Sequence, residues 1–148
     1  MADIDQIKKL REETSASIAD CREVLDEAKG NYSKALEFLK KKGIEKAEKK
    51  QDRETLQGIV ESYVHQRKVG VLVIVTCETD FVARTTEFKN LAHEIALQVS
   101  AMNPKDVDGL LRQEYIRDSS LTIEQLIKQT IGKLGENIVV REFSRLEL

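Results

Sequence analysis

Cysteine, histidine and proline are all scarce in this chain of 148 residues, which has two cysteines, two histidines, one proline and no tryptophan. Cys21 and Cys77 lie far apart, and neither belongs to a C-x-x-C pair or a Cys/His cluster, so we expect two reduced, hydrophobic thiols and no metal site. The sequence also lacks the phosphate-binding motif G-x-x-x-x-G-K, the zinc-binding motif H-E-x-x-H and the nucleophile motif G-x-S-x-G. The two histidines, His65 and His93, fall on different predicted elements. The sequence therefore predicts a protein that is not an enzyme and binds no cofactor.

An excess of charge of one sign is missing too. Lysine and arginine number 24 against 26 aspartates and glutamates, a net charge of -2, so no basic surface favours direct contact with nucleic acid. Residues 1–5 are acidic, and no apolar segment is long enough for a secretory signal or a membrane span. We expect a cytoplasmic protein with no membrane partner.

The most informative stretch is an apolar run, Val71–Val75, that stops at an acidic and aromatic cluster. Its β-branched residues predict a strand, and the lack of alternating polar residues predicts that both faces are covered. Helical periodicity resumes only at Phe88. Asp80 and Phe81 therefore occupy a strand-to-helix connection, where a rigid scaffold can present side chains to a partner.

Two interpretations of this connection follow from the local pattern. In one, Phe81 folds back under the sheet as a hydrophobic plug while Asp80 caps the next turn. In the other, Phe81 is an exposed wedge and Asp80 an acidic group, both directed at another molecule. The pattern alone leaves both open.

The first 45 residues predict three short helices. Apolar spacing indicates a helix over residues 4–13. Ser17 and Asn31 are candidate N-caps for a second and a third helix, which we expect to end at Gly30 and Gly43. Residues 1–45 thus form a predicted three-helix domain, and the charged residues 46–56 form a predicted helical linker.

Residues 57–148 predict an α+β domain. Strand patterns cover Gly58–His65, Val69–Cys77 and Asn137–Leu146. Helical patterns run from Phe88 to a stop at Asn103-Pro104, and from a cap at Thr122 or Ser120 to Gly135. We expect a three-stranded antiparallel sheet backed by helices.

Four stretches of the sequence together resemble the translation elongation factor Ts family, the guanine nucleotide exchange factors of elongation factor Tu. They occur in the family's order and cover most of the chain: Leu10–Leu25, Ser62–Val73, Cys77–Ala83 and Gly135–Arg141. One departure is the first loop, Thr14-Ser15-Ala16-Ser17, where the family usually has T-G-A-G. Longer members also carry a helical insertion near Asn103-Pro104 that this chain lacks.

The resemblance implies a set of partner-binding residues for elongation factor Tu. Phe81 would enter a hydrophobic gap, Asp80 would disturb the Mg²⁺ surroundings, and Thr79 and Val82 would position them. The resemblance implies that the helical domain, residues 1–45, is similar to ubiquitin-associated domains and adds Arg11, Ile18 and Ala19 to this set. The end of the first strand would add His65. The resemblance also implies that a short member can form a non-covalent homodimer. An alternative is a ubiquitin-associated-like interaction scaffold without exchange activity.

Overall fold

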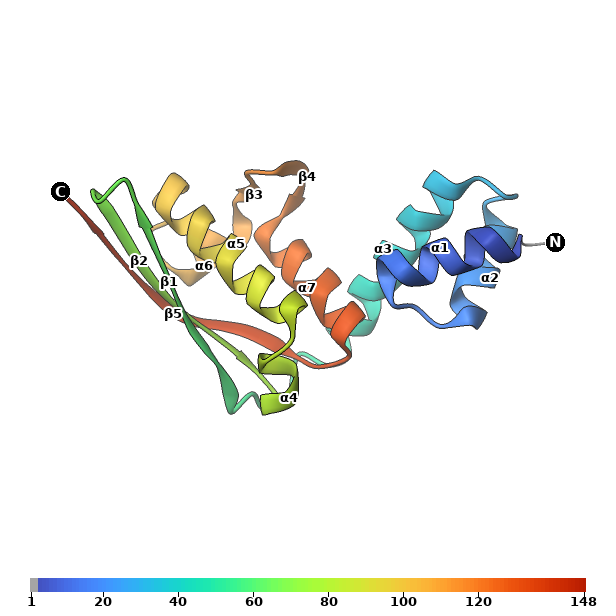
Figure 1. Ribbon diagram of the computed structural model, residues 1–148, viewed down its shortest axis with the longest axis horizontal. Helices are drawn as coiled ribbons and strands as arrows, with labels where there is room; N and C mark the ends of the chain where they lie inside the picture. Colours follow the sequence, from blue (N-terminus) through green and yellow to red (C-terminus); the bar gives the residue numbers. More distant parts are fainter. Residues whose placement is uncertain (1–2) are drawn as a thin grey trace.

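A computed structural model describes residues 3–148, which form a three-helix bundle joined to an α+β core, giving an elongated molecule (Figure 1). The helices are α1 Ile4–Thr14, α2 Ile18–Glu27, α3 Tyr32–Glu48, α4 Asp80–Ala83, α5 Thr86–Met102, α6 Val107–Arg112 and α7 Ile123–Leu134. The strands are β1 Gln57–His65, β2 Val69–Cys77, β3 Glu114–Tyr115, β4 Asp118–Thr122 and β5 Ile138–Glu147. The predicted α+β class with a three-stranded antiparallel sheet is confirmed.

The bundle has its own small hydrophobic core. Ser17 and Asn31 cap α2 and α3 as predicted, because their side chains accept from the backbone N–H groups of Asp20 and Lys34. The buried residues of this core are Ile7, Leu10, Cys21, Val24, Leu25, Ala28, Ala35 and Leu39. A core of this size contributes modest stability, so contacts with the rest of the chain matter for the bundle.

Ser15 adopts a left-handed backbone conformation, with φ 57° and ψ 16°, at the end of α1. Its N–H donates to the carbonyl of Arg11 and so completes the last turn. This is the loop in which the family usually has glycines. A non-glycine residue in this conformation costs about 1 kcal/mol, so the chain keeps the turn at a small cost in stability.

The third helix is longer than the sequence predicts. Gly43 does not end α3, which continues to Glu48, and Ala47 in its last turn is buried in the core of the α+β domain. Residues 49–56 are turns and extended chain, so only the first three residues of the predicted helical linker are helical. Gly43 lies inside the helix and against Gly132 of α7, and it is at Gly132 that the close approach requires a residue without a side chain.

The main sheet has the strand order β1-β2-β5 with antiparallel pairs throughout. Gln66 and Arg67, both with positive φ, form the turn between β1 and β2, and the N–H of Lys68 donates to the carbonyl of His65. Two successive positive-φ residues are typical of the turn that matches the twist of a hairpin. A register shift beside Ile74 and Val75 bends the β2–β5 ladder.

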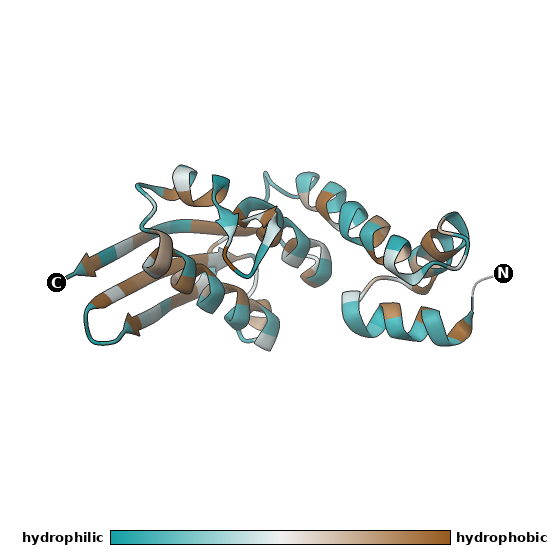
Figure 2. Cartoon of the chain, turned by 90° about the horizontal axis from the view of Figure 1, so that it is seen from above, coloured by the Kyte–Doolittle hydropathy of each residue, from teal (hydrophilic) through white to brown (hydrophobic). Residues whose placement is uncertain are grey.

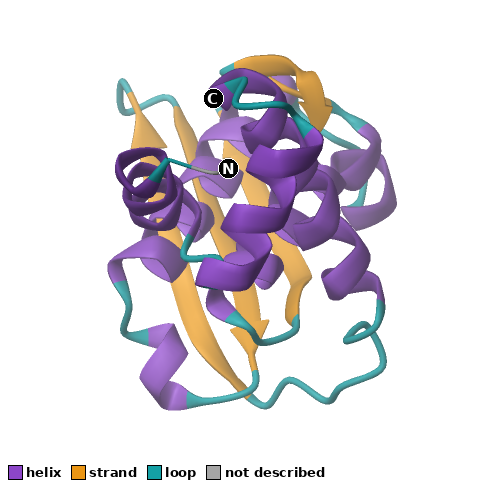
Figure 3. Cartoon of the chain, turned by 90° about the vertical axis from the view of Figure 1, so that its right-hand side faces the viewer, coloured by secondary structure: helices purple, strands orange, loops and turns teal. Residues whose placement is uncertain are grey.

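Helices cover only one face of this sheet (Figures 1 and 3). Val71, Val73 and Val75 point toward α5 and α7 and are buried. Leu72, in the same strand, is 52% exposed on the opposite face, so the prediction that both faces are covered is wrong for the chain by itself. We call this opposite surface the outer sheet face; its exposed apolar residues are Val60, Val64, Leu72, Val139 and Leu146.

Apolar residues recur along all three strands of the sheet (Figure 2), as expected for a sheet with a buried face and an outer face that is partly apolar.

A small hairpin, β3 and β4, lies outside the sheet and was not predicted. In α5 and α7 the predicted boundaries are close, with the stop at Asn103 and the cap at Thr122 both observed. Within residues 3–148, none of the helices has the length and apolar character needed to cross a membrane.

Candidate functional site

Thr79 and the single helical turn α4, Asp80–Ala83, follow the central strand β2 closely. The side chain of Thr79 caps this turn by accepting from the backbone N–H of Val82 at 3.2 Å, so the cap is Thr79 and not Asp80. Val82 and Ala83 are buried and anchor the turn to the hydrophobic core. The inner side of α4 is thus fixed, and its outer side is available to other molecules.

Phe81 is 81% exposed. This exposure excludes the interpretation of Phe81 as a plug beneath the sheet. A phenyl ring that is held on an anchored turn and left in water gains much apolar burial when another surface covers it. The geometry therefore fits an aromatic side chain presented for contact.

Glu136, in the connection between α7 and β5, holds the start of this turn. Its carboxylate accepts from the backbone N–H of Thr79 at 3.0 Å and from the Thr79 hydroxyl at 2.7 Å. Hydrogen bonds to a carboxylate are stronger than those between neutral groups, and two of them restrict both position and rotation. Glu136 therefore orients the residue that precedes Asp80 and Phe81.

The two acidic residues of the cluster point to different partners. Asp80 pairs with Arg84 on the exposed side of α4 at 2.6 Å, and Glu78 lies 3.7 Å from Arg53 in the segment before β1. They therefore do not form a carboxylate pair of the kind used in acid–base catalysis. Among residues 3–148, no group of three or more histidine, cysteine, aspartate or glutamate residues is placed to hold a metal ion.

Cys77 lies at the end of β2 immediately before the cluster and is buried. Burial, with Glu136 nearby, raises the pKa of this thiol to about 11. The thiol is consequently neutral at physiological pH and donates to the carbonyl of Thr79 at 3.2 Å. Its role is to pack and to support the turn, since the reactive form of cysteine is the thiolate.

The bundle residues predicted to bind a partner are all on its surface. Arg11 is exposed, and its Nε donates to the carbonyl of Ala16 at 3.3 Å, across the α1–α2 loop. Ile18 is 49% exposed at the start of α2, and Ala19 beside it is also exposed. The hydrogen bond thus ties Arg11 to the loop that leads into α2, where Ile18 and Ala19 are exposed.

His65 lies at the opposite end of the sheet from the α4 turn, because β1 pairs with β2 from Gln57–Cys77 to His65–Val69. The ring is exposed, and its Nδ1 is 2.8 Å from the hydroxyl of Tyr63. The structure thus groups the predicted partner-binding residues in two places, Thr79–Val82 at one end of the sheet and Arg11, Ile18 and Ala19 in the bundle. His65 belongs to neither group. Contact of any of them with a partner stays a prediction.

Sequence reasoning missed two features of the α4 turn. Glu136 was present in the stretch Gly135–Arg141 that supports the family resemblance, but nothing in the local pattern connects it with Thr79. Leu56, directly before β1, is 74% exposed and follows Thr55, whose hydroxyl is 2.7 Å from that of Thr76. Leu56 therefore adds exposed apolar surface at the same end of the sheet as Phe81.

Comparison with known proteins adds independent information. The family model described as elongation factor TS matches residues 78–148. Over the whole chain, the protein is 42% identical to elongation factor Ts of Rippkaea orientalis, with 79% of that protein covered. It is 41% identical to the chloroplastic elongation factor Ts of Guillardia theta over 96% of the chain and 86% of that protein, and 42% identical to elongation factor Ts of Coprothermobacter proteolyticus over 96% and 95%.

The alignment with the Rippkaea protein spans 197 positions, which exceeds the 148 residues of this chain, so that relative has inserted residues that are missing here. Identity at this level over nearly the full chain, together with the match of the α4 turn and everything that follows it, indicates common ancestry and a common fold. The chain belongs to the elongation factor Ts family.

Proposed function

We propose that this protein binds elongation factor Tu and accelerates the release of GDP from it during polypeptide elongation. Membership of the family supports the partner and the process. The observation that carries the proposal is the exposed ring of Phe81 on a turn fixed by Glu136 and by the buried Val82. In this proposal the protein acts by binding and does no chemistry of its own.

The thermodynamics of exchange explain why an anchored wedge is useful. A GTPase that holds its nucleotide with nanomolar affinity has a binding free energy of about 12 kcal/mol, much of it from phosphate and Mg²⁺ contacts. An exchange factor that binds the nucleotide-free form more tightly must weaken nucleotide binding by the same factor. The gain available to Phe81 on burial is part of that differential affinity.

Within the site, each residue has a distinct proposed role. Phe81 enters an apolar gap of the GTPase, and Asp80 acts on the polar surroundings of its Mg²⁺. Val82, which is buried in the core, and Thr79, which is held by Glu136, keep these two side chains in place. The surface formed by Arg11, Ile18 and Ala19 contributes affinity on the same GTPase, and His65 makes a separate contact.

The direct test uses elongation factor Tu loaded with a fluorescent GDP analogue in the presence of excess unlabelled GDP. The protein should increase the rate of fluorescence change in a concentration-dependent manner, and Phe81→Ala should reduce that rate at least about tenfold while retaining the native circular dichroism spectrum. Met102→Ala, which truncates another exposed apolar residue at the end of α5, is the matched control. Binding without faster release would favour the interaction scaffold instead.

We further propose that the chain forms a non-covalent homodimer through the outer sheet face. The outer sheet face carries five exposed apolar residues, and no helix of the described residues covers them. So much apolar area on one side of a sheet is unusual for a surface that stays in water. A two-fold axis would place this face against its own copy, and both cysteines are buried and free, so no disulfide takes part. Direct binding of nucleic acid or membrane is not part of the proposal.

A further inference from the structure

The bundle and the α+β core meet where α3 crosses α7, and two glycines form the crossing point. A Cβ atom on Gly132 would lie 2.7 Å from Cα and 2.8 Å from the carbonyl oxygen of Gly43. Both distances are shorter than contacts that Cβ atoms make in proteins, so position 132 has no room for a side chain unless the helices move. The two helix backbones therefore touch directly, at a separation that any larger residue at position 132 would increase.

Besides the glycine contact, α3 is held by Ala47, which is buried in the core of the α+β domain. A cavity of about 200 Å³ adjoins the crossing, and both glycines belong to its lining together with lysines from α3 and α7. The ion pair between Lys128 and Glu48 spans the same junction at 3.5 Å, but Glu48 is exposed and such a pair contributes little. The contact between the glycines thus sets how closely α3 approaches α7 at the crossing.

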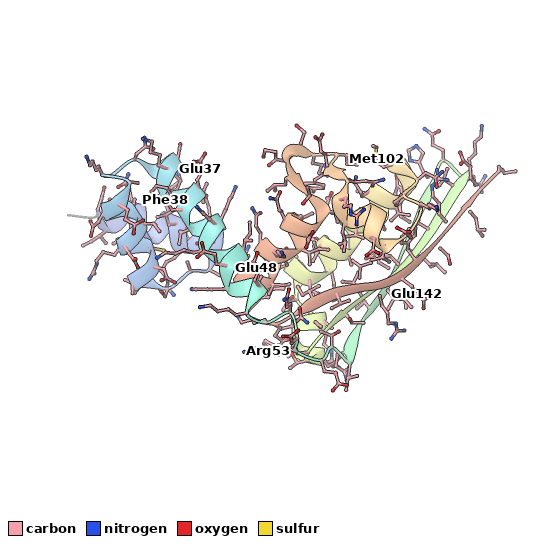
Figure 4. The ribbon with its side chains drawn as sticks, turned by 180° about the vertical axis from the view of Figure 1, so that it is seen from behind. Glu37, Phe38, Glu48, Arg53, Met102 and Glu142 are labelled. Atoms are coloured by element: carbon pink, nitrogen blue, oxygen red, sulfur yellow. The ribbon has the colours of Figure 1, made fainter. Side chains whose placement is uncertain are left out.

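A second connection lies just beyond α7. Asn137 is buried, and its amide nitrogen donates to the carbonyl of Arg53 at 2.7 Å and to that of Gln51 at 3.3 Å. These carbonyls belong to the segment that leaves the bundle, and Figure 4 shows Glu48 and Arg53 at the junction between the two parts. The neighbouring residue, Glu136, holds Thr79. One corner of the core therefore holds both the chain from the bundle and the α4 turn.

We propose that Gly132 and Asn137 are positioning residues that hold the bundle at a preset placement relative to the α4 turn. The surface around Arg11 and Ile18 and the turn with Asp80 and Phe81 are then presented to one partner as a single rigid surface. This inference rests on the proposed function. Its physical basis is that a second contact made by a rigidly connected surface loses less entropy than one made by a loosely tethered surface.

Two pairs of variants test the proposal. Gly132→Ala forces the helices apart, whereas Gly43→Ala is its matched control, because a Cβ there would lie at an ordinary 3.9 Å from Gly132. Both changes replace a helical glycine by a better helix former. Asn137→Asp keeps the size of the side chain but removes both donated hydrogen bonds, and Asn90→Asp makes the same charge change on the exposed side of α5.

In the GDP-release assay, Gly132→Ala and Asn137→Asp should raise the half-saturating concentration of the protein about tenfold and leave the maximal rate within about twofold. The two controls should match the unmodified protein. Unchanged half-saturating concentrations in folded Gly132→Ala and Asn137→Asp would overturn the proposal. If Asn137→Asp does not fold, Gly132→Ala decides alone.

A second measurement does not depend on any partner. Nuclear magnetic relaxation of backbone amides gives rotational correlation times for α1–α3 and for the α+β core separately. We expect equal values in the unmodified protein and a shorter value for the bundle in Gly132→Ala and Asn137→Asp. Independent tumbling of the bundle in the unmodified protein would overturn the proposal. Absence of stimulated GDP release with equal correlation times would refute the proposed function but leave the fixed placement standing.

Discussion

Asp80 and Arg84 lie one helical turn apart, and Nη2 of Arg84 is 2.6 Å from Oδ2 of Asp80 on the exposed side of α4. An exposed pair at this spacing contributes only about 0.3–0.5 kcal/mol, so a partner can replace Arg84 at little cost. The acid that precedes Phe81 is therefore kept in a defined orientation and is still available to another molecule.

Asp80→Asn tests whether the charge of Asp80 serves the stability of the protein, through Arg84, or its proposed action on elongation factor Tu. The amide has the same shape without the charge, so the free energy of unfolding should change by less than about 0.5 kcal/mol. The maximal rate of GDP release from elongation factor Tu should nevertheless fall several-fold, because the negative charge is what disturbs the Mg²⁺ surroundings in the proposed function. Asp108→Asn in α6 is the control, and an unchanged maximal rate in Asp80→Asn would contradict the role of the acid.

Glu136→Gln tests the support of the α4 turn from outside it. Glutamine offers only one acceptor oxygen, so one of the two hydrogen bonds from Thr79 is lost and the protein should be destabilised by about 1 kcal/mol in urea unfolding. Since Phe81 and Asp80 then lose a fixed orientation, the maximal release rate should also decrease. Glu37→Gln, at an exposed position of α3, should change neither quantity. A folded Glu136→Gln variant with the normal maximal rate would show that the orientation of Thr79 is unimportant.

The outer sheet face makes a prediction about assembly. Leu72→Lys places a charge in the middle of this face, so the protein should sediment as a monomer at concentrations where the unmodified chain is a dimer. Ile116→Lys changes an exposed apolar residue in the β3–β4 connection and should leave the dimer intact. Analytical ultracentrifugation measures both. An unmodified chain that stays monomeric at every concentration would rule out the dimer.

Asp20, in α2, forms an ion pair with Lys46 near the end of α3, and this pair should make the stability of the protein depend on pH. The Nζ of Lys46 lies 2.7 Å from its carboxylate, and this hydrogen bond lowers the pKa of Asp20 despite the opposing effect of burial. A lowered pKa in the folded state means that the ionised carboxylate stabilises the fold above its unfolded pKa of about 3.9. That stabilisation is lost as the pH falls through the lower, folded value.

Asp20→Asn should therefore reduce the free energy of unfolding by about 0.5–1 kcal/mol at neutral pH, and by less at about pH 3, which is below the unfolded pKa of about 3.9, because the stabilisation by the ionised carboxylate is already declining there. Urea unfolding at the two pH values measures this difference. Asp26→Asn in the same helix is the control, and an equal loss of stability at both pH values would mean that the ionised state of Asp20 is not responsible.

Local signals in the sequence were sufficient for most of the secondary structure. The side chains of Ser17, Asn31 and Thr122 each cap a helix through a hydrogen bond to a residue three positions later, so the cap is encoded within four residues. The apolar run before Thr79 likewise predicted both β2 and the connection that follows it. Such features depend on interactions between near neighbours.

The local pattern failed where two distant segments meet. Gly43 looks like a helix end when it is read alone, but α3 continues through it, and the added turn buries Ala47 in the core of the α+β domain. The continuous apolar run of β2 indicates coverage of both faces, but it does not distinguish a helix of the same chain from a second molecule.

The sequence by itself determined the caps, the strands and the placement of Asp80 and Phe81 between a strand and a helix, because hydrogen bonding and side-chain periodicity over a few residues decide them. Only the tertiary structure decided that Phe81 points outward, that Glu136 holds Thr79 across 57 positions of sequence, and that α3 runs through Gly43. These features arise from close packing and from the pairing of polar groups that meet only after folding.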